Sequence, residues 1–241
     1  MSYEVETAAI YDLYFGDRTP EVEHWVRLAG PAPARLLEPM CGTAEVAFLL
    51  AARGYEVTGV DLSQPMLAVA EERRLAVAGE VSERVTLVCG DICRVALPES
   101  HFDFAYVGNG SWNLLTDRDL RVSALRAIRR SLRPGGRLVL AALFHPFAAS
   151  RCTEPRSFRP FRPAPAGMEI EKSSHMERDA DRQLVQIHER LTVNGQVSAH
   201  HLTLQVLRPE ELTAELREAG FALIEIADPA TGDYAAIGTV K

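Results

Sequence analysis

Residues 36–50 of this 241-residue chain read LLEPMCGTAEVAFLL. An apolar run leads to an acid at Glu38, a turn of small residues follows, and a helical pattern begins at Ala44. Nucleotide-binding strand–turn–helix units begin in this way, but turns that bind a diphosphate usually carry two or three glycines, and this one has only Gly42. Glu38 and Glu45 also place negative charge beside the turn, which disfavours a diphosphate and favours a positively charged nucleoside.

Two more acids follow the next predicted strands, Asp61 in GVDLSQPM and Asp91 in VTLVCGDI. The carboxyl ends of parallel strands meet at one edge of a sheet, so these acids and Glu38 are expected around one ligand. Asp61 can accept both hydroxyls of an unphosphorylated ribose. Asp91 can accept an adenine amine while the Ile92 backbone pairs with the ring edge. An ammonium and a sulfonium near Glu38 would complete the ligand. A molecule with these two cations, a free ribose diol and an adenine is S-adenosylmethionine.

Each acid also has a simpler interpretation. Asp61, followed by Ser63, could only cap the next helix. Asp91 could be an ordinary turn residue after a glycine, and Glu38 a surface acid. The common position of the three acids at consecutive strand ends favours the shared ligand site.

Short apolar strands and amphipathic helices alternate from residue 35 onward, which predicts an α/β fold with a parallel sheet. Strands are expected at 35–38, 56–61, 85–90, 102–107 and 137–143, and helices at 44–53, 64–78 and 117–132. The Pro- and Arg-rich residues 148–167 show no periodicity and predict a loop or linker. Strand-like runs follow at 168–176, 184–193 and 196–207, with the hairpin signal Asn194-Gly195 between the last two. A last helix from Pro209 and strands at 222–226 and 234–240 complete the pattern.

These patterns divide the chain into four parts. Residues 1–34 form N-terminal lid helices, 35–147 a cofactor-binding core, 148–207 a linker with a small antiparallel insertion, and 208–241 the C-terminal part of the core.

Four runs of the sequence resemble, in order, the motifs of class I S-adenosylmethionine-dependent methyltransferases. The runs are LLEPMCGTAEVAFLLAARGYEVTGVDLSQPML, VTLVCGDI, FDFAYVGNG and SLRPGGRLVL. They span residues 36–144, and RPEELTAELREAGF…IGTVK resembles the last helix and strands of that family. The pattern is most similar to bacterial small-molecule N- and O-methyltransferases. The resemblance implies a Rossmann-like, seven-stranded, mostly parallel sheet whose last strand, residues 234–240, is reversed.

The resemblance also implies a cofactor site. Its members would be the acids Glu38, Asp61 and Asp91, the turn residues Met40 and Gly42, the adenine neighbours Leu62 and Ile92, Met66, Gly108 with its carbonyl on the methionine ammonium, and Tyr11 above the cofactor. Ala44 departs from the pattern because the family has a glycine there. Its methyl group would either narrow the methionine pocket or turn outward.

The N-terminal run IYDLYF resembles the lid helix of small-molecule methyltransferases that act on amino sugars and glycine. Tyr11 and Tyr14 could share one helix face over the cofactor, or could be core aromatics. The candidate catalytic residues are Tyr14 and His145, which is the preferred general base, although a loop histidine before Pro146 is the simpler interpretation. The turn GNGSW lacks the Asn/Asp-Pro-Pro-Tyr run of enzymes that methylate DNA bases or glutamine.

A two-residue Asn-Gly turn would pair His188 with His201 and place them on one polar face of the hairpin. That face is either solvated or turned toward a substrate or a second subunit. Two histidines lack a third metal ligand, so no metal is expected. The arginines and phenylalanines of residues 151–162 either clamp an anionic substrate or form a solvated surface loop.

The formal charge of -7 argues against binding to nucleic acid or an anionic membrane. No apolar run approaches the roughly 20 residues of a membrane span, and four scattered cysteines form no disulfide pattern. We therefore expect a cytoplasmic protein, with a homodimer left open. The function that fits best is methyl transfer from S-adenosylmethionine to an amine or hydroxyl of a small molecule. The alternatives are an RNA or protein methyltransferase, a non-catalytic S-adenosylmethionine-binding regulator and, last, a nicotinamide dehydrogenase.

Overall fold

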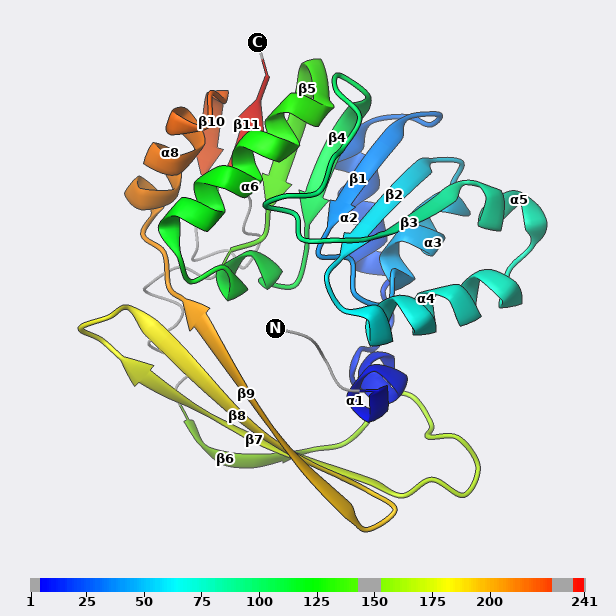
Figure 1. The fold of residues 1–241 in the computed structure, drawn as a ribbon. Coiled ribbons are helices and arrows are strands. Elements are labelled where there is room, and N and C mark those ends of the chain that lie inside the picture. Colours follow the sequence, from blue (N-terminus) through cyan, green and yellow to red (C-terminus); the bar gives the residue numbers. More distant parts are fainter. Residues whose placement is uncertain (1–4, 143–152, 227–235, 241) are drawn as a thin grey trace.

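The computed structural model describes residues 5–142, 153–226 and 236–240. A seven-stranded sheet forms the core, and a separate four-stranded sheet lies beside it (Figure 1). The strand order of the large sheet is β10-β11-β5-β4-β1-β2-β3. Its strands are β1 Arg35–Pro39, β2 Glu56–Asp61, β3 Val85–Cys89, β4 Phe102–Val107, β5 Leu132–Leu140, β10 Ala222–Ile226 and β11 Ala236–Thr239. Strand β11 runs antiparallel to both of its neighbours, which confirms the predicted sheet with a reversed last strand.

The chain reverses its direction of winding at β1, which pairs with β2 on one side and with β4 on the other. Both pairings are parallel, and Leu36 and Leu37 of β1 are completely buried. In open α/β sheets the crevice for a ligand lies at the carboxyl ends of strands beside such a reversal. Glu38, near the end of β1, is therefore at the expected place.

Helices cover both faces of the large sheet (Figure 1). The helices are α2 Thr19–Ala29, α3 Glu45–Ala51, α4 Gln64–Ala76, α5 Gly79–Glu83, α6 Arg118–Ser131 and α8 Pro209–Glu218. One core cluster joins the sheet to α2 and α3 through Trp25 and Phe48, and the other joins it to α6 and α8 through Leu125 and Leu212. The short helix α5 was not predicted from the sequence. Across the described ranges, no helix combines the length and the apolar character needed to cross a membrane.

Helices α6 and α8 are connected by a buried ion pair. Arg121 is 5% exposed and Glu215 is 2% exposed, and the Arg121 guanidinium donates to both Glu215 carboxylate oxygens at distances from 2.7 to 3.2 Å. Its remaining nitrogen donates to the carbonyl of Leu115 at 2.8 Å and to that of Thr116 at 3.2 Å. These bonds satisfy the buried charges, which would otherwise be strongly unfavourable.

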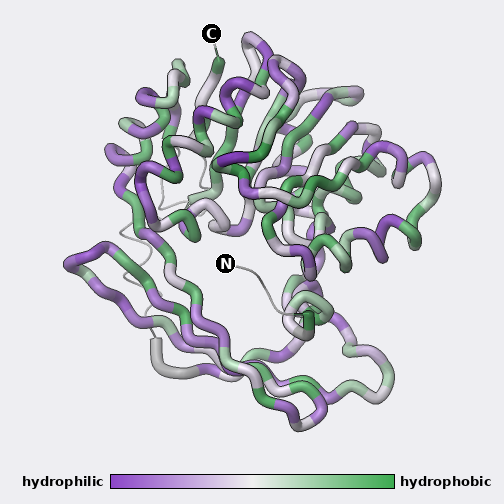
Figure 2. The backbone as a smooth tube through the Cα atoms, in the orientation of Figure 1, coloured by the Kyte–Doolittle hydropathy of each residue, from purple (hydrophilic) through white to green (hydrophobic). Residues whose placement is uncertain are grey.

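The small sheet has the order β6-β7-β8-β9 and consists of β6 Thr153–Phe158, β7 Ile170–Asp179, β8 Leu184–Val193 and β9 Gln196–Gln205. His188 lies opposite His201 and Val193 opposite Gln196, so the predicted hairpin register is confirmed. The turn residues Asn194 and Gly195 have φ of 48° and 80°, and a type I′ turn requires positive φ at both positions. Hydrophobic and hydrophilic residues alternate along this sheet (Figure 2).

Strand β6 lies within residues 148–167, for which the sequence predicted a loop or linker. Its residues Arg156 to Phe158 pair with Ser174 to Lys172 of β7, so that prediction is wrong for this part of the segment. An edge strand has a partner on one side only, and it therefore tolerates a proline and needs no regular alternation of apolar residues. Strand β6 forms because it pairs with β7, and the sequence of β6 alone does not show this pairing.

Before α2, the chain forms α1 Val5–Ile10 and the 3-10 helix η1 Tyr11–Tyr14. In Figure 1, α1 lies between the large sheet and the small sheet. A hydrogen bond of 2.7 Å between the Thr7 hydroxyl and His200 Nε2 joins α1 to β9. The N-terminal segment thus contacts the insertion.

Candidate active site

The turn between β1 and α3 contains three residues in the left-handed region. Met40, Gly42 and Ala44 have φ of 60°, 55° and 53°. A residue with a side chain pays about 1–3 kcal/mol for this conformation. The Ala44 methyl group is completely buried in the core cluster on the α2 and α3 face, and this burial offsets part of the strain. The alanine that replaces the family glycine therefore belongs to the core.

Asp61 joins the turn after β1 to the beginning of α4. Its Oδ2 accepts the Gly42 N–H at 2.7 Å, and its Oδ1 accepts the Ser63 N–H at 2.8 Å. The hydroxyl of Ser63 then accepts the Met66 N–H at 3.5 Å, so Ser63 is the helix cap. Burial raises the pKa of Asp61, while the backbone donors act in the opposite direction. Asp61 lies at the carboxyl end of β2, where a bound ribose is predicted.

The predicted adenine neighbours differ in exposure. Asp91 Oδ1 accepts the Cys93 N–H at 2.9 Å, so this acid shapes its own turn. Leu62 is 52% exposed and has surface available to a ligand. Ile92 and Met66 are 5% and 1% exposed, and their side chains are part of the protein interior. Contact of these four side chains with the cofactor stays a prediction.

Glu38 is a buried carboxylate, 7% exposed, with no hydrogen-bond partner on Oε2 among the described residues. Burial raises its pKa to about 8, the Tyr106 hydroxyl and Arg18 lower it, and Glu21 raises it further. Arg18 is 8% exposed and forms an ion pair of 2.6 Å with Glu21. Once this acid is ionised, its Oε2 can accept a hydrogen bond from a cation.

Gly108, directly after β4, lies against Glu21. A Cβ atom added to Gly108 would meet Glu21 Oε1 at 2.9 Å, so no side chain fits there without movement. The Gly108 carbonyl accepts the Ser111 N–H at 3.1 Å, and its contact with the methionine ammonium stays a prediction. Glu21 also accepts the Trp25 indole N–H at 3.2 Å.

A chain of charged contacts ties the N-terminal segment to the turn after β1. Asp12 Oδ1 accepts the Thr43 hydroxyl at 2.7 Å, and Asp12 Oδ2 lies 2.5 Å from Arg73. Arg73 is 3.8 Å from Glu45, and Glu45 is 2.5 Å from Arg162 of the insertion. Arg162 therefore forms a specific ion pair, in contrast to the predicted solvated surface loop.

A cavity of about 730 Å³ lies between the N-terminal segment, the carboxyl edge of the large sheet and the small sheet. Tyr11 and Tyr14 line it, and Asn109 and Gly110 line it directly after Gly108. Apolar side chains of the small sheet form much of its wall, namely Met176, Val185, Ile187, Leu191, Leu202 and Leu204. Phe158, Arg159 and Phe161 of the Arg-rich segment also contribute.

Inside this cavity, Tyr14, Lys172 and Glu189 form a polar group. Lys172 Nζ is 2.8 Å from Glu189 Oε1 and 4.8 Å from the centre of the Tyr14 ring. The Tyr14 hydroxyl is buried without a hydrogen-bond partner among the described residues. Burial, followed by the negative charge of Glu189, raises the pKa of Tyr14. Tyr14 is therefore a neutral hydrogen-bonding group rather than a base at neutral pH.

The other predicted catalytic residue, His145, lies outside the described residues. Sequence reasoning did not identify Arg18, Glu21, Lys172 or Glu189. Only the even spacing of Lys172, Ser174 and Met176 could have placed Lys172 on the cavity side of a strand. The polar hairpin face with His188 and His201 is opposite to the cavity side, so the alternative that it faces a substrate is wrong.

Comparison with known proteins also indicates a methyltransferase. Residues 36–136 match the family model described as "Methyltransferase domain". The cypemycin N-terminal methyltransferase of a Streptomyces species is 29% identical over 160 residues, which cover 65% of this chain and 58% of that protein. The chain spans about half the length of the curated relatives it matches.

Two solved structures resemble nearly the whole chain. Streptomyces venezuelae DesVI has a TM-score of 0.81 at 21% identity, with coverage of 99% of this chain and 100% of that chain. The glycopeptide N-methyltransferase MtfA, solved with S-adenosylmethionine, has a TM-score of 0.64 at 27% identity, with coverage of 94% and 95%.

The fold, the acids at the strand ends and the family match together define the class. Residues 36–136 match a methyltransferase domain, and with the similar solved structures this match supports a class I S-adenosylmethionine-dependent enzyme, whose cofactor is S-adenosylmethionine. The class predicted from the sequence motifs is therefore confirmed.

Proposed function

We propose that the whole chain transfers the methyl group of S-adenosylmethionine to an amine or hydroxyl of a small molecule. The observation that carries this proposal is the cavity beside the cofactor crevice, lined mainly by apolar side chains and by a few polar groups. Small-molecule sites have this composition. The similarity to the cypemycin N-terminal methyltransferase and to the glycopeptide N-methyltransferase MtfA supports an amine as the acceptor.

In this proposal the cofactor lies across the carboxyl ends of β1, β2, β3 and β4. Asp61 accepts the ribose hydroxyls, the turn at Asp91 receives adenine, and Glu38 with the Gly108 carbonyl faces the methionine ammonium. Arg18 lies close enough to Glu38 to lower its pKa and can hold the methionine carboxylate. Since Asn109 and Gly110 line the cavity next to Gly108, the sulfonium methyl would face the acceptor.

Methyl transfer is an in-line displacement. The acceptor lone pair forms a bond to the methyl carbon, the carbon–sulfur bond breaks, and the sulfur leaves as the thioether of S-adenosylhomocysteine. An amine acceptor then loses one proton to solvent or to a nearby base. Because the sulfonium is already activated, the protein mainly aligns the acceptor and excludes water. The Tyr14 hydroxyl and Glu189 are the cavity groups suited to orient an amine.

Tyr14→Phe tests this role. We expect turnover to fall by about 10- to 100-fold, because the acceptor loses one hydrogen bond that fixes its direction of attack. The affinity for S-adenosylmethionine should change little. Formation of S-adenosylhomocysteine is measured over a library of amines and alcohols. Tyr55→Phe is the matched control, because the Tyr55 hydroxyl donates to the Gly30 carbonyl and does not line the cavity. An unchanged rate in Tyr14→Phe would remove Tyr14 from the acceptor site.

Cofactor binding should also release a proton from Glu38. The folded pKa of about 8 exceeds the ordinary value of 4.5, so the free protein holds this proton at pH 7. A neighbouring cation favours the carboxylate, and affinity should therefore rise with pH, by at most about tenfold per unit, until pH 8. Calorimetry in two buffers of different ionisation enthalpy measures the released proton. The same release from Glu38→Gln would show that the proton comes from elsewhere.

The alternatives give different results in the same assays. Cofactor binding without turnover of any acceptor would favour a regulator. Turnover with RNA or protein alone would favour a macromolecule methyltransferase, against which the net charge of -7 argues.

A further inference from the structure

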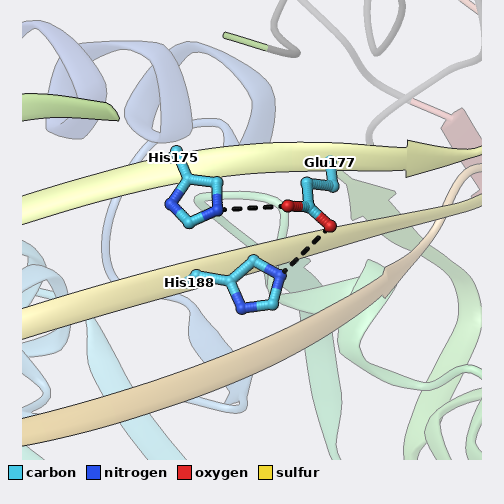
Figure 3. Close-up of side chains that lie close together, drawn as sticks. All are labelled: His175, Glu177 and His188. Carbon is cyan, nitrogen blue, oxygen red and sulfur yellow. Dashed lines mark hydrogen bonds and ion pairs between the residues drawn. The ribbon is translucent and has the colours of Figure 1, made fainter. Parts of the chain in front are cut away.

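The outer face of the small sheet carries a cluster of metal-binding side chains. His175 of β7 lies directly opposite His188 of β8, and Glu177 is two residues from His175 on the same face. The cavity-lining residues of these strands, such as Ser174 and Ile187, alternate with this cluster. The cluster therefore faces away from the acceptor cavity. Figure 3 shows the two imidazole rings side by side, with the Glu177 carboxylate reaching both.

The distances within the cluster approach those of a metal site. His175 Nε2 is 3.3 Å from Glu177 Oε1, and His188 Nε2 is 3.7 Å from Glu177 Oε2. One ligand atom from each of the three residues can be chosen so that all lie within 4.8 Å of one another. Ligand atoms about 2.0–2.2 Å from a zinc ion lie about 3.5 Å apart in a tetrahedral site. A small rotation of the two imidazole rings would bring the ligand atoms from separations of up to 4.8 Å to the spacing of a tetrahedral site.

A fourth residue fixes the orientation of His188. The Nδ1 atoms of His188 and His201 are 2.9 Å apart, so one of the two carries the proton and the other accepts it. When His188 Nδ1 carries the proton, its Nε2 presents a lone pair toward Glu177. That Nε2 atom is buried and has no hydrogen-bond partner among the described residues. Metal-binding histidines commonly have such a second hydrogen bond on the other ring nitrogen.

The predicted hairpin paired His188 with His201 but offered no third ligand, and the expectation of no metal rested on that absence. Strand β7 supplies the missing groups, since the non-local pairing with β8 brings His175 and Glu177 beside His188. In the part of the chain that the structure describes, this is the one cluster of three such side chains that could hold a metal ion.

We propose that His175, Glu177 and His188 bind one divalent transition-metal ion of the zinc type. Two imidazoles and one carboxylate suit zinc, cobalt or nickel, whereas magnesium and calcium prefer oxygen ligands alone. The ion would join β7 to β8 on the face opposite to the acceptor cavity. It therefore acts on the small sheet and takes no part in methyl transfer.

Calorimetric titration with zinc chloride, after dialysis against a chelator, tests the proposal. We expect one ion per chain with a Kd of about 10 μM or tighter. His188→Ala and Glu177→Gln should each weaken binding at least about tenfold, since each removes one of three ligands. His101→Ala is the matched control, because His101 precedes β4 in the large sheet and is outside the cluster. Circular dichroism confirms that each variant is folded.

Two results would overturn the proposal. One is the absence of any zinc binding at millimolar concentration. The other is wild-type affinity in both His188→Ala and Glu177→Gln, which would place the ion elsewhere. Anomalous scattering at the zinc edge from a soaked crystal gives an independent position, and a peak between His175 and His188 would support the assignment. None of these readouts depends on methyltransferase activity.

Discussion

Glu215→Ala is expected to lower the free energy of unfolding by about 3–5 kcal/mol, because the buried Arg121 guanidinium then loses its counter-charge. The Arg121 bonds to the Leu115 and Thr116 carbonyls remain, but they do not neutralise the charge. Since the pair joins α6 to α8, the loss acts on the packing of both helices against the large sheet. Urea unfolding followed by circular dichroism measures the change.

Glu218→Ala is the matched control for this prediction. Glu218 pairs with Arg118 and Arg126 at 2.5 and 3.1 Å, but its side chain is 39% exposed. Exposed pairs contribute little, so the unfolding midpoint should stay close to that of the wild type. Equal midpoints for Glu215→Ala and Glu218→Ala would show that the buried pair is not needed for stability.

The second large effect is expected for Asp61→Ala, which should weaken S-adenosylmethionine binding by about 1–3 kcal/mol, or roughly 5- to 150-fold in Kd. Two losses add together. The ribose hydroxyls lose a charged acceptor, and the Gly42 N–H loses the carboxylate that holds the turn after β1. Titration calorimetry measures the affinity, with the far-ultraviolet spectrum as a check on folding.

Asp103→Ala is a suitable comparison for Asp61→Ala. Asp103 also accepts a backbone N–H, that of Arg35 at 2.6 Å, but it lies near the amino end of β4. Its removal deletes the same charge far from the carboxyl edge, and cofactor affinity should be retained. If Asp61→Ala and Asp103→Ala bind the cofactor equally well, Asp61 does not belong to the cofactor site.

The sequence predicted those features that local patterns determine. The positions of Glu38, Asp61 and Asp91 at or near the ends of β1, β2 and β3 follow from apolar runs that lead to an acid. The hairpin register follows from Asn194-Gly195, because a two-residue turn fixes every pair after it. The reversed last strand came from the family resemblance and is confirmed by its pairing with β5 and β10.

The features that the sequence did not predict depend on contacts between distant segments. Strand β6 forms because β7 offers it a free edge. Arg18 approaches Glu38 only when α2 packs on the sheet, and Glu189 meets Tyr14 only when the insertion covers the N-terminal segment. Isolated acids and arginines are common on solvated surfaces, so their spacing alone gave no signal.

The contacts of Asp12 and Glu45 connect the turn after β1 to the wall of the proposed acceptor cavity. Asp12 holds Thr43 of the cofactor turn, while Arg162, which pairs with Glu45, also donates to the Gly16 carbonyl at 2.9 Å beside the wall of the acceptor cavity. A ligand that rearranges the contacts at the turn after β1 changes the free energy of ligand binding at the acceptor cavity, and the reverse holds as well. Thermodynamic linkage then requires reciprocity, so that the cofactor alters the affinity for the acceptor by the same factor by which the acceptor alters that for the cofactor.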